Sequence, residues 1–326
     1  MKNFYFYQIM IGILAGLFSS IIGIIIINVA NIAPYLSPLL GCFISLPIFI
    51  VAFGRGTLSS FFALISATIM LAITNNFYIG FGFMLFFFLP AFYASWLLGL
   101  ARPAQKENSL VWYPLSSVIF LLTNFIALIS TFIGVYIQTN QSAPIIIKEI
   151  TETIVQAMRQ SQSISEADIL AFSELLTTHA ATLTAIILTV YSLIFLIGNL
   201  YFSMVTAQYL KWFTRPRDDW SQTFRLPISG LITFIVAGTG SMMRLGSILD
   251  LSTRVFATAY IVVIAISGLS YLHNITKGIN GRTIILFFVY TAIFTVFFAS
   301  PVFIMMLLMG IWATIQYHSK SRDKLH

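Results

Sequence analysis

The chain has 326 residues, of which 59% are hydrophobic and only 8% are charged. Soluble domains carry roughly 25% charged residues, and a water-soluble protein of this size needs such side chains to cover its surface. Together with a mean hydropathy of +0.94, the composition excludes a soluble enzyme, a disordered chain and a disulfide scaffold. It predicts an all-α fold, a polytopic bundle of transmembrane helices embedded in a lipid bilayer.

The formal net charge of +7 does not indicate nucleic-acid binding, because the cations are scattered between apolar blocks and form no basic run. The single cysteine, Cys42, allows no internal disulfide. The four histidines lack the spacing of a metal site. We therefore expect neither a metal nor a cofactor.

Apolar windows bounded by polar residues, glycine or proline predict ten membrane-spanning helices. They cover residues 7–29, 37–53, 57–74, 79–100, 113–137, 181–210, 228–243, 255–273, 283–299 and 301–317. We interpret the first window as an uncleaved helix rather than a signal peptide, because it is long enough to span and further spans follow it. Pro301 is interpreted as part of a hairpin, because one helix through both final windows would be about 52 Å long.

The distribution of lysine and arginine predicts an even number of crossings. If Lys2 lies in the cytoplasm, 13 of the 17 cations fall in cytoplasmic connections or tails, which is the bias of the positive-inside rule. The cations on the opposite side are Lys148, Arg159, Arg244 and Arg254. Ten spans with both termini in the cytoplasm is the arrangement that best fits this bias.

The prediction divides the chain into three parts. Residues 1–137 form a membrane half of five helices, 138–180 an extracytoplasmic helical segment, and 181–326 a second five-helix half with a short basic cytoplasmic tail. In the middle segment, Ser165 and Asp168 predict the capped start of a helix. This segment is interpreted either as a lid over an outer cavity or as a cap without a gating role.

Acidic residues are absent from the first four predicted spans, since the first one in the chain is Glu107, and none lies at the centre of a later span. Proton- and sodium-coupled carriers usually keep such a group at mid-membrane, so we do not expect an ion-coupled antiporter. The motifs GxSxG and HExxH are absent as well. We predict no enzymatic activity and no catalytic residues.

Polar residues near the predicted outer ends of the spans form a candidate ligand-binding site. The candidates are Asn75, Asn76, Arg244, Asp250 and Arg254. A glycine-rich stretch at 238–241 could loosen its helix and offer backbone groups to an anionic ligand. The alternative is an ordinary interfacial turn, in which Asp250 caps a helix and pairs with Arg254.

Two stripes of small residues recur at four-residue spacing and predict close helix contacts. They consist of Gly12, Gly16 and Ser20 on the first span, and of Ser59, Ala63 and Ala67 on the third. The stripes are interpreted either as docking faces for a partner protein or as internal packing surfaces.

The connection 211–227 combines aromatic residues with Arg215 and Arg217. It is interpreted either as a docking surface for a cytoplasmic partner or as a loop anchored at the membrane surface by its tryptophans.

Several short segments together resemble the YybS-like family of uncharacterised bacterial inner-membrane proteins, a domain of unknown function. The matching stretches are Leu46-Pro47 through Phe53-Gly54-Arg55-Gly56, Leu89-Pro90-Ala91, Trp112-Tyr113-Pro114, Phe224-Arg225-Leu226-Pro227 and Gly310-Ile311-Trp312. That family is distantly similar to the substrate-binding subunits of energy-coupling-factor vitamin transporters. The resemblance implies a multi-pass protein of the bacterial inner membrane. It also implies a small molecule bound at the outer polar residues and a coupling protein docked on the small-residue stripes.

Two functions follow as hypotheses. The first is binding or transport of a small molecule in the manner of an energy-coupling-factor substrate-binding subunit. The alternative is a membrane scaffold or assembly factor that acts through protein partners without a small-molecule ligand.

Overall fold

The computed structural model describes residues 2–33, 36–103, 110–140, 165–213, 215–216, 218–243, 245–295 and 301–322, with a few further residues between 148 and 159. Within this part of the chain, helices make up nearly all of the regular structure. The all-α prediction is therefore confirmed, apart from one short β-hairpin. The predicted segment 138–180 is described mainly in its second half, and most residues between 141 and 164 lie outside the described part.

The elements before the middle segment include the hairpin. They are α1 (Lys2–Ile32), α2 (Ser37–Gly41), α3 (Leu46–Arg55), α4 (Thr57–Thr74), α5 (Phe77–Phe83), the π-helix η1 (Met84–Phe88), α6 (Leu89–Leu98), β1 (Ala101–Pro103), β2 (Leu110–Trp112) and α7 (Leu115–Thr139). The two strands pair antiparallel, with Arg102 opposite Val111.

The elements after it are all helical. They are α9 (Glu166–Tyr209), α10 (Trp220–Thr223), α11 (Ile228–Met242), α12 (Ser247–Ile275), α13 (Arg282–Thr295) and α14 (Pro301–Arg322). The predicted window 255–273 therefore belongs to a longer helix, because α12 begins eight residues earlier at Ser247.

The predicted span 37–53 is not one helix. Helix α2 ends at Gly41, and a turn precedes α3, which has Pro47 in its first turn. Because proline has no N–H, residue 47 cannot donate to the carbonyl of Phe43. That carbonyl instead accepts the backbone N–H of Leu46 at 3.2 Å. The span is consequently split into two short helices.

A second irregularity lies in the predicted span 79–100, where α5, η1 and α6 follow one another without a gap. Within η1 the backbone N–H of Leu89 donates to the carbonyl of Met84, five residues earlier. Pro90 explains this wider turn, because it cannot donate to the carbonyl four residues before it and its ring crowds that carbonyl.

Helix α9 joins two elements that the sequence predicts separately. The side chain of Ser165 accepts the backbone N–H of Asp168 at 3.2 Å, which confirms the predicted cap. The helix then continues for 44 residues to Tyr209 without interruption. The predicted soluble helix and the predicted span 181–210 are therefore one rigid element.

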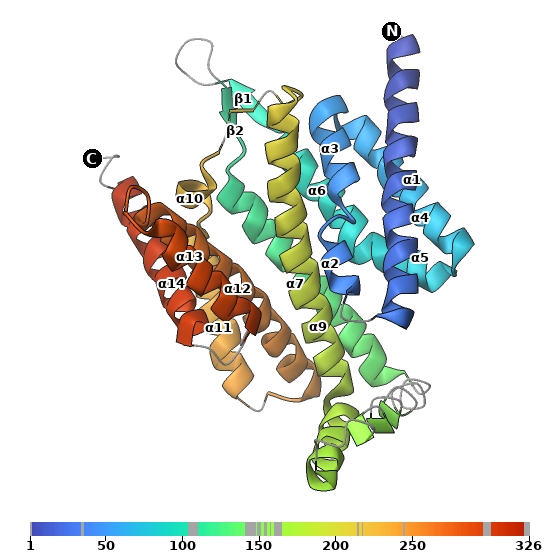
Figure 1. Cartoon of the computed structure of the whole chain (residues 1–326), viewed down its shortest axis with the longest axis vertical. Coiled ribbons are helices and arrows are strands. Elements are labelled where there is room, and N and C mark those ends of the chain that lie inside the picture. Colours follow the sequence, from blue (N-terminus) through green and yellow to red (C-terminus); the bar gives the residue numbers. More distant parts are fainter. Residues whose placement is uncertain are drawn as a thin grey trace.

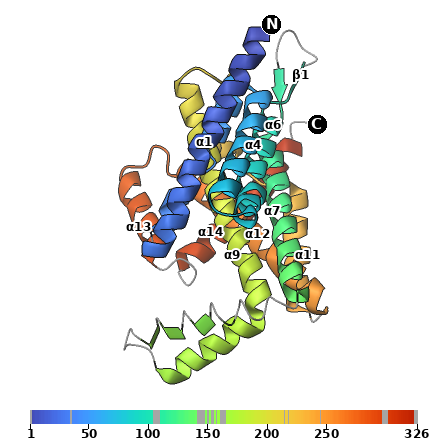
Figure 2. The same cartoon turned by 90° about the vertical axis from the view of Figure 1, so that its right-hand side faces the viewer.

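Figure 1 shows α9 running between two groups of helices, α1–α6 on one side and α10–α14 on the other. The main core fills the space between α3, α4, α6, α7, α9 and α12 and includes Phe49, Leu122 and Leu196. The N-terminal end of α9 projects beyond the bundle in both views (Figures 1 and 2).

The start of α1, the end of α14 and the hairpin β1–β2 lie toward the same end of the bundle (Figure 1). We call this the basic end, because its described connections carry Arg55, Arg102, Arg215, Arg225 and Lys277.

Within the described residues, seven helices are long and apolar enough to cross a membrane. Three further apolar helical stretches are shorter and cover Leu39–Arg55, Ile228–Met242 and Arg282–Ile293, the first of which includes the turn between α2 and α3. Large apolar side chains such as Phe18, Ile235 and Phe288 are at least 60% exposed, as expected for helix faces that contact lipid rather than water. The structure thus gives seven of the ten predicted spans the length of a crossing.

Candidate functional site

The predicted outer polar residues do not assemble into one site. Asn75 and Asn76 lie at the corner between α4 and α5, whereas Asp250 and Arg254 lie in the first two turns of α12. Figure 1 shows α4 and α5 well separated from α12. Arg244 lies outside the described residues.

Most of these polar side chains form hydrogen bonds with groups close to them in the sequence. The side chain of Asn76 caps α5 by accepting the N–H of Ile79 at 2.8 Å. Asp250 accepts the N–H of Leu245 at 2.9 Å, and Arg254 is exposed. No ion pair between Asp250 and Arg254 is present in the described part of α12. The geometry fits the interfacial turn better than a ligand pocket, although without the expected pairing.

The two small-residue stripes face each other. Gly12 and Gly16 of α1 are buried, as are Ser20, Ser59, Ala63 and Ala67. A Cβ atom at Gly16 would overlap the carbonyl oxygen of Ala63, and one at Gly12 would overlap that of Ser59. The hydroxyl of Ser66 on α4 also donates to the carbonyl of Ile13 on α1 at 3.2 Å. The docking interpretation is corrected here, because each stripe is covered by the other.

Arg215 makes internal contacts that stabilise the fold. Its side chain is 4% exposed and pairs with Asp218 at 2.8 Å. The same guanidinium donates to the carbonyls of Tyr113 at 2.8 Å and Leu98 at 3.3 Å. These bonds tie the connection 211–227 to the ends of α6 and β2. This position argues against direct docking through Arg215, and Arg217 lies outside the described residues.

A second arginine, Arg225, holds the other end of this connection. It donates to the carbonyl of Ser221 at 2.6 Å and to the hydroxyl of Ser270 on α12 at 3.0 Å. Its guanidinium also lies 5.4 Å from the centre of the Tyr271 ring, a cation–π distance. Burial lowers the pKa of Arg225, and these neutral acceptors and the aromatic face compensate part of the cost of burying its charge.

The third tie is an exposed ion pair between the connection and the end of α12. Lys277 lies 2.6 Å from the carboxylate of Asp219. Asp219 also caps α10 by accepting the backbone N–H of Ser221. The hydrogen bond from Lys277 and then that from Ser221 lower the pKa of Asp219. The described residues of the connection 211–227 consequently form an ordered platform rather than a loose loop.

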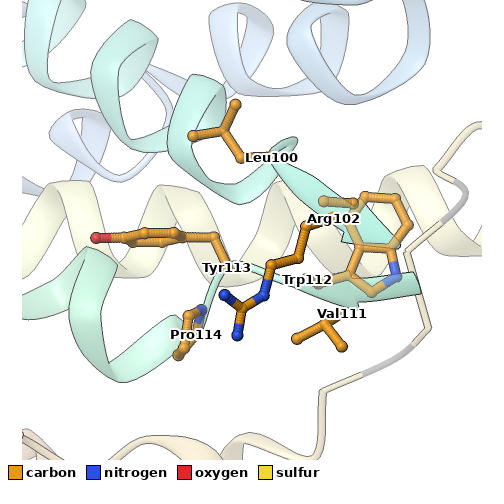
Figure 3. A pocket seen from close by; sticks show the side chains of 7 residues that line it. Leu100, Arg102, Val111, Trp112, Tyr113 and Pro114 are labelled. Atoms are coloured by element: carbon orange, nitrogen blue, oxygen red, sulfur yellow. The ribbon is translucent and has the colours of Figure 1, made fainter. Parts of the chain in front are cut away.

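Cavities adjoin this platform at the basic end. The first, of about 360 Å³, lies at the base of the hairpin, where Arg102 and Tyr113 contribute to its lining. Figure 3 shows the Arg102 guanidinium between Tyr113 and Val111 and beside Pro114. A second cavity, of about 280 Å³, shares Pro114 with the first and reaches Asp218. The described lining presents mixed polar and apolar surface.

Inside the bundle lies a buried polar contact that was not predicted from the sequence. Asn199 of α9 is fully buried and donates to the carbonyl of Gly41 at 3.1 Å, at the break between α2 and α3. Its side-chain oxygen has no hydrogen-bond partner among the described residues. In the same break, the hydroxyl of Ser45 donates to the carbonyl of Phe87 in η1 at 3.2 Å. The broken helix, the π-helix and Asn199 therefore meet at one place.

This contact lies deep in the membrane-spanning part. Asn199 is ten residues before Tyr209, the end of α9, and so about 15 Å along the helix from that end, half of the roughly 30 Å hydrocarbon layer. An unsatisfied amide oxygen at such a depth is costly. The sequence does carry a signal for this contact. The apolar window 181–210 contains one asparagine, and two other windows contain Pro47 and Pro90.

Taken together, the apolar helices define the class of the protein as integral membrane. No family model matches the chain, and neither a curated protein nor a solved structure does. The resemblance to the YybS-like family stays a prediction.

Proposed function

We propose that the chain crosses the bacterial inner membrane ten times, with the basic end and both termini in the cytoplasm. The placement of the start of α1 and the end of α14 at one end supports this topology (Figure 1). The three shorter apolar helices then also count as crossings. The cations that gather at the basic end agree with the positive-inside rule.

Cysteine labelling in intact cells tests the topology. In a Cys42→Ser background, Thr178→Cys on the exposed start of α9 should react with a membrane-impermeant maleimide. Ala101→Cys on exposed β1 should react only after the cells are permeabilised. Labelling of both sites in intact cells, or only of Ala101→Cys, would refute the orientation.

Within this topology, the proposed function is binding or transport of a small molecule, in the manner of an energy-coupling-factor substrate-binding subunit. The observation that carries it is the buried Asn199 beside the broken helix α2–α3. Helix breaks that expose backbone groups near mid-membrane are a recurrent way of building substrate sites in transporters. The free oxygen of Asn199 would accept a hydroxyl or amine donor of the ligand. Any coupling protein would dock elsewhere than on the stripes of α1 and α4.

Ligand-induced thermal stabilisation tests this proposal. The purified protein should unfold at a higher temperature with at least one member of a panel of vitamins, nucleosides and metal chelates, because a ligand of the native state stabilises it by mass action. Asn199→Leu should abolish the shift. Asn124→Leu is the matched control, because it makes the same substitution on another helix, α7, where the Asn124 side chain donates to the carbonyl of Phe120. A flat response across the panel, or a shift that persists in Asn199→Leu, would contradict the proposal.

The second candidate function is a membrane scaffold, and the exposed hairpin at the basic end favours it. Leu110 is 56% and Val111 is 44% exposed on β2, beside the cavity lined by Arg102. Affinity capture of the intact protein should then recover a stoichiometric partner, which Val111→Glu releases. Ile279→Glu is the control, because Ile279 is an equally exposed apolar residue in another turn at the same end. Recovery of the protein alone would refute this function.

A further inference from the structure

A polar cluster lies between α12 and α13 at the basic end, and neither proposed function uses it. His273, in the last turn of α12, is 2.9 Å from the hydroxyl of Tyr290 on α13. Arg282, at the start of α13, approaches the other ring nitrogen of His273 at 3.4 Å. All three side chains therefore face the space between the two helices.

Arg282 lacks an anionic partner in the described part of the chain. None of the ion pairs found there includes it, whereas the neighbouring Lys277 pairs with Asp219. Its Nε atom is buried and has no hydrogen-bond acceptor among the described residues. A guanidinium with an unused, buried donor is a strong recognition group for phosphate, which accepts two parallel hydrogen bonds from it.

Directly beyond this cluster lies an apolar cavity of about 150 Å³. The described residues that line it are all apolar and include Ile194 of α9, Ala265 and Leu269 of α12, and Ile293 of α13. Because this described lining offers no polar group, a hydrocarbon chain suits the cavity better than water or a polar solute.

Helical spacing places the cavity and the polar cluster in the same groove. Leu269 is four residues before His273 on α12, and Ile293 is three residues after Tyr290 on α13. Residues three or four apart lie on one helix face, about 5–6 Å apart along the axis. The polar cluster therefore lies roughly one helical turn from the apolar cavity, on the same faces of α12 and α13.

Helix α9 closes the groove in the same way. Ile194 lines the apolar cavity, and Tyr201 lies two turns later on the same face. Tyr201 lines a larger cavity of about 430 Å³ with Trp220, Lys277, Asp218 and Asp219. The two carboxylates are already paired, with Arg215 and Lys277. The ring of Tyr201 lies 5.1 Å from that of Trp220. Aromatic rings of this kind typically mark the level of the lipid headgroups.

We propose that this groove between α9, α12 and α13 binds one anionic phospholipid. Its phosphate would bond to Arg282 and to the hydroxyl of Tyr290, and one acyl chain would enter the apolar cavity beside Leu269. The lipid, rather than a soluble phosphate, is favoured because the cation and the apolar cavity are joined in one groove at an aromatic level.

Native mass spectrometry of the full-length protein with added phosphatidylglycerol tests this site. A charge-assisted hydrogen bond contributes about 1.5 kcal/mol or more, which corresponds to roughly a tenfold change in affinity. Arg282→Gln should therefore weaken phosphatidylglycerol binding about tenfold, and Arg282→Lys, which keeps the charge but not the two parallel hydrogen bonds, should weaken it less than Arg282→Gln does. Arg254→Gln removes an exposed cation at the opposite end of the same helix and should leave binding unchanged.

Two further measurements test the apolar cavity and the phosphate-binding cluster separately. Ala265→Phe fills the apolar cavity and should weaken binding of phosphatidylglycerol, while glycerol 3-phosphate should bind at least a hundredfold more weakly than the lipid. Thermal unfolding in lipid-free detergent identifies any variant that is merely misfolded. Equal binding of phosphatidylcholine, equal binding of glycerol 3-phosphate, or full binding by a folded Arg282→Gln variant would each overturn the proposal.

Discussion

Replacing Gly16 by alanine tests whether the small-residue stripe of α1 is an internal contact or a surface for another protein. A Cβ atom at this position would lie 2.9 Å from the carbonyl carbon of Ala63 and overlap its oxygen. Those atoms belong to the backbone of α4, so no rotamer change can relieve the overlap. Helix α1 would have to move away from α4 by roughly 1 Å, and overpacking of this kind typically costs about 1–3 kcal/mol.

The matched control is Gly198→Ala on α9. Nothing lies within 4 Å of a Cβ atom at Gly198, although it is also a helical glycine in an apolar span. There the substitution should be neutral or stabilise the protein by up to about 1 kcal/mol, because alanine has the higher helix propensity. The two substitutions are chemically identical, so their difference isolates the contact with α4.

Thermal unfolding of the purified protein in detergent, without any partner, measures both effects. We expect Gly16→Ala to unfold at a lower temperature than the wild type and Gly198→Ala at an equal or higher one. If Gly16→Ala were as stable as Gly198→Ala, the stripe would be free in the isolated protein, and the packing argument would fail.

Three further perturbations probe other contacts. Arg215→Ala should destabilise the protein by about 3 kcal/mol in denaturant unfolding, because it leaves the carboxylate of Asp218 without its buried partner; an effect below about 1 kcal/mol would show that the tie is unimportant. Gly268→Ala should destabilise as Gly16→Ala does, since its Cβ atom would overlap the backbone of α14, and unchanged thermal unfolding would contradict that contact. The pKa of Asp219 is held below its usual 3.8 by Lys277, so this carboxylate stabilises the fold above that pH and loses its effect as the pH falls through the lowered value. Thermal unfolding of Asp219→Asn should therefore differ from the wild type at neutral pH, begin to converge with it below pH 3.8 and coincide with it below the lowered pKa; a constant difference would refute the assignment.

Much of the helical architecture could be predicted because lipid exposure leaves a simple signal, a long apolar window. That signal does not report backbone continuity. The window 37–53 is apolar throughout, yet Pro47 and the turn before it divide it into α2 and α3. Conversely, the predicted boundary near residue 180 separated a polar from an apolar segment, although no proline or glycine interrupts α9 there. Hydropathy follows the solvent around a helix, whereas hydrogen bonding determines where the helix ends.

The candidate site was harder to predict, because the sequence gives residue types but not which residues face each other. The stripes containing Gly16 and Ala63 predicted close contacts correctly, but only the structure shows that they contact one another. The internal contacts of Arg215 could not be predicted for the same reason, since the carbonyls that it binds lie on distant segments. The contact of Asn199 was not predicted, because this residue lies in an apolar window and its partner Gly41 is 158 residues away in the sequence.

The length of α9 has a mechanical consequence. Its 44 residues form a rod of about 66 Å, more than twice the roughly 30 Å hydrocarbon layer. Asn199 divides the rod into arms of about 50 Å toward Glu166 and about 15 Å toward Tyr209. If the helix pivoted at the contact between Asn199 and Gly41, a sideways displacement of its end at Glu166 would appear at its end at Tyr209 at roughly one third of the size. A continuous helix of this length could therefore couple its two ends without any change in its own conformation.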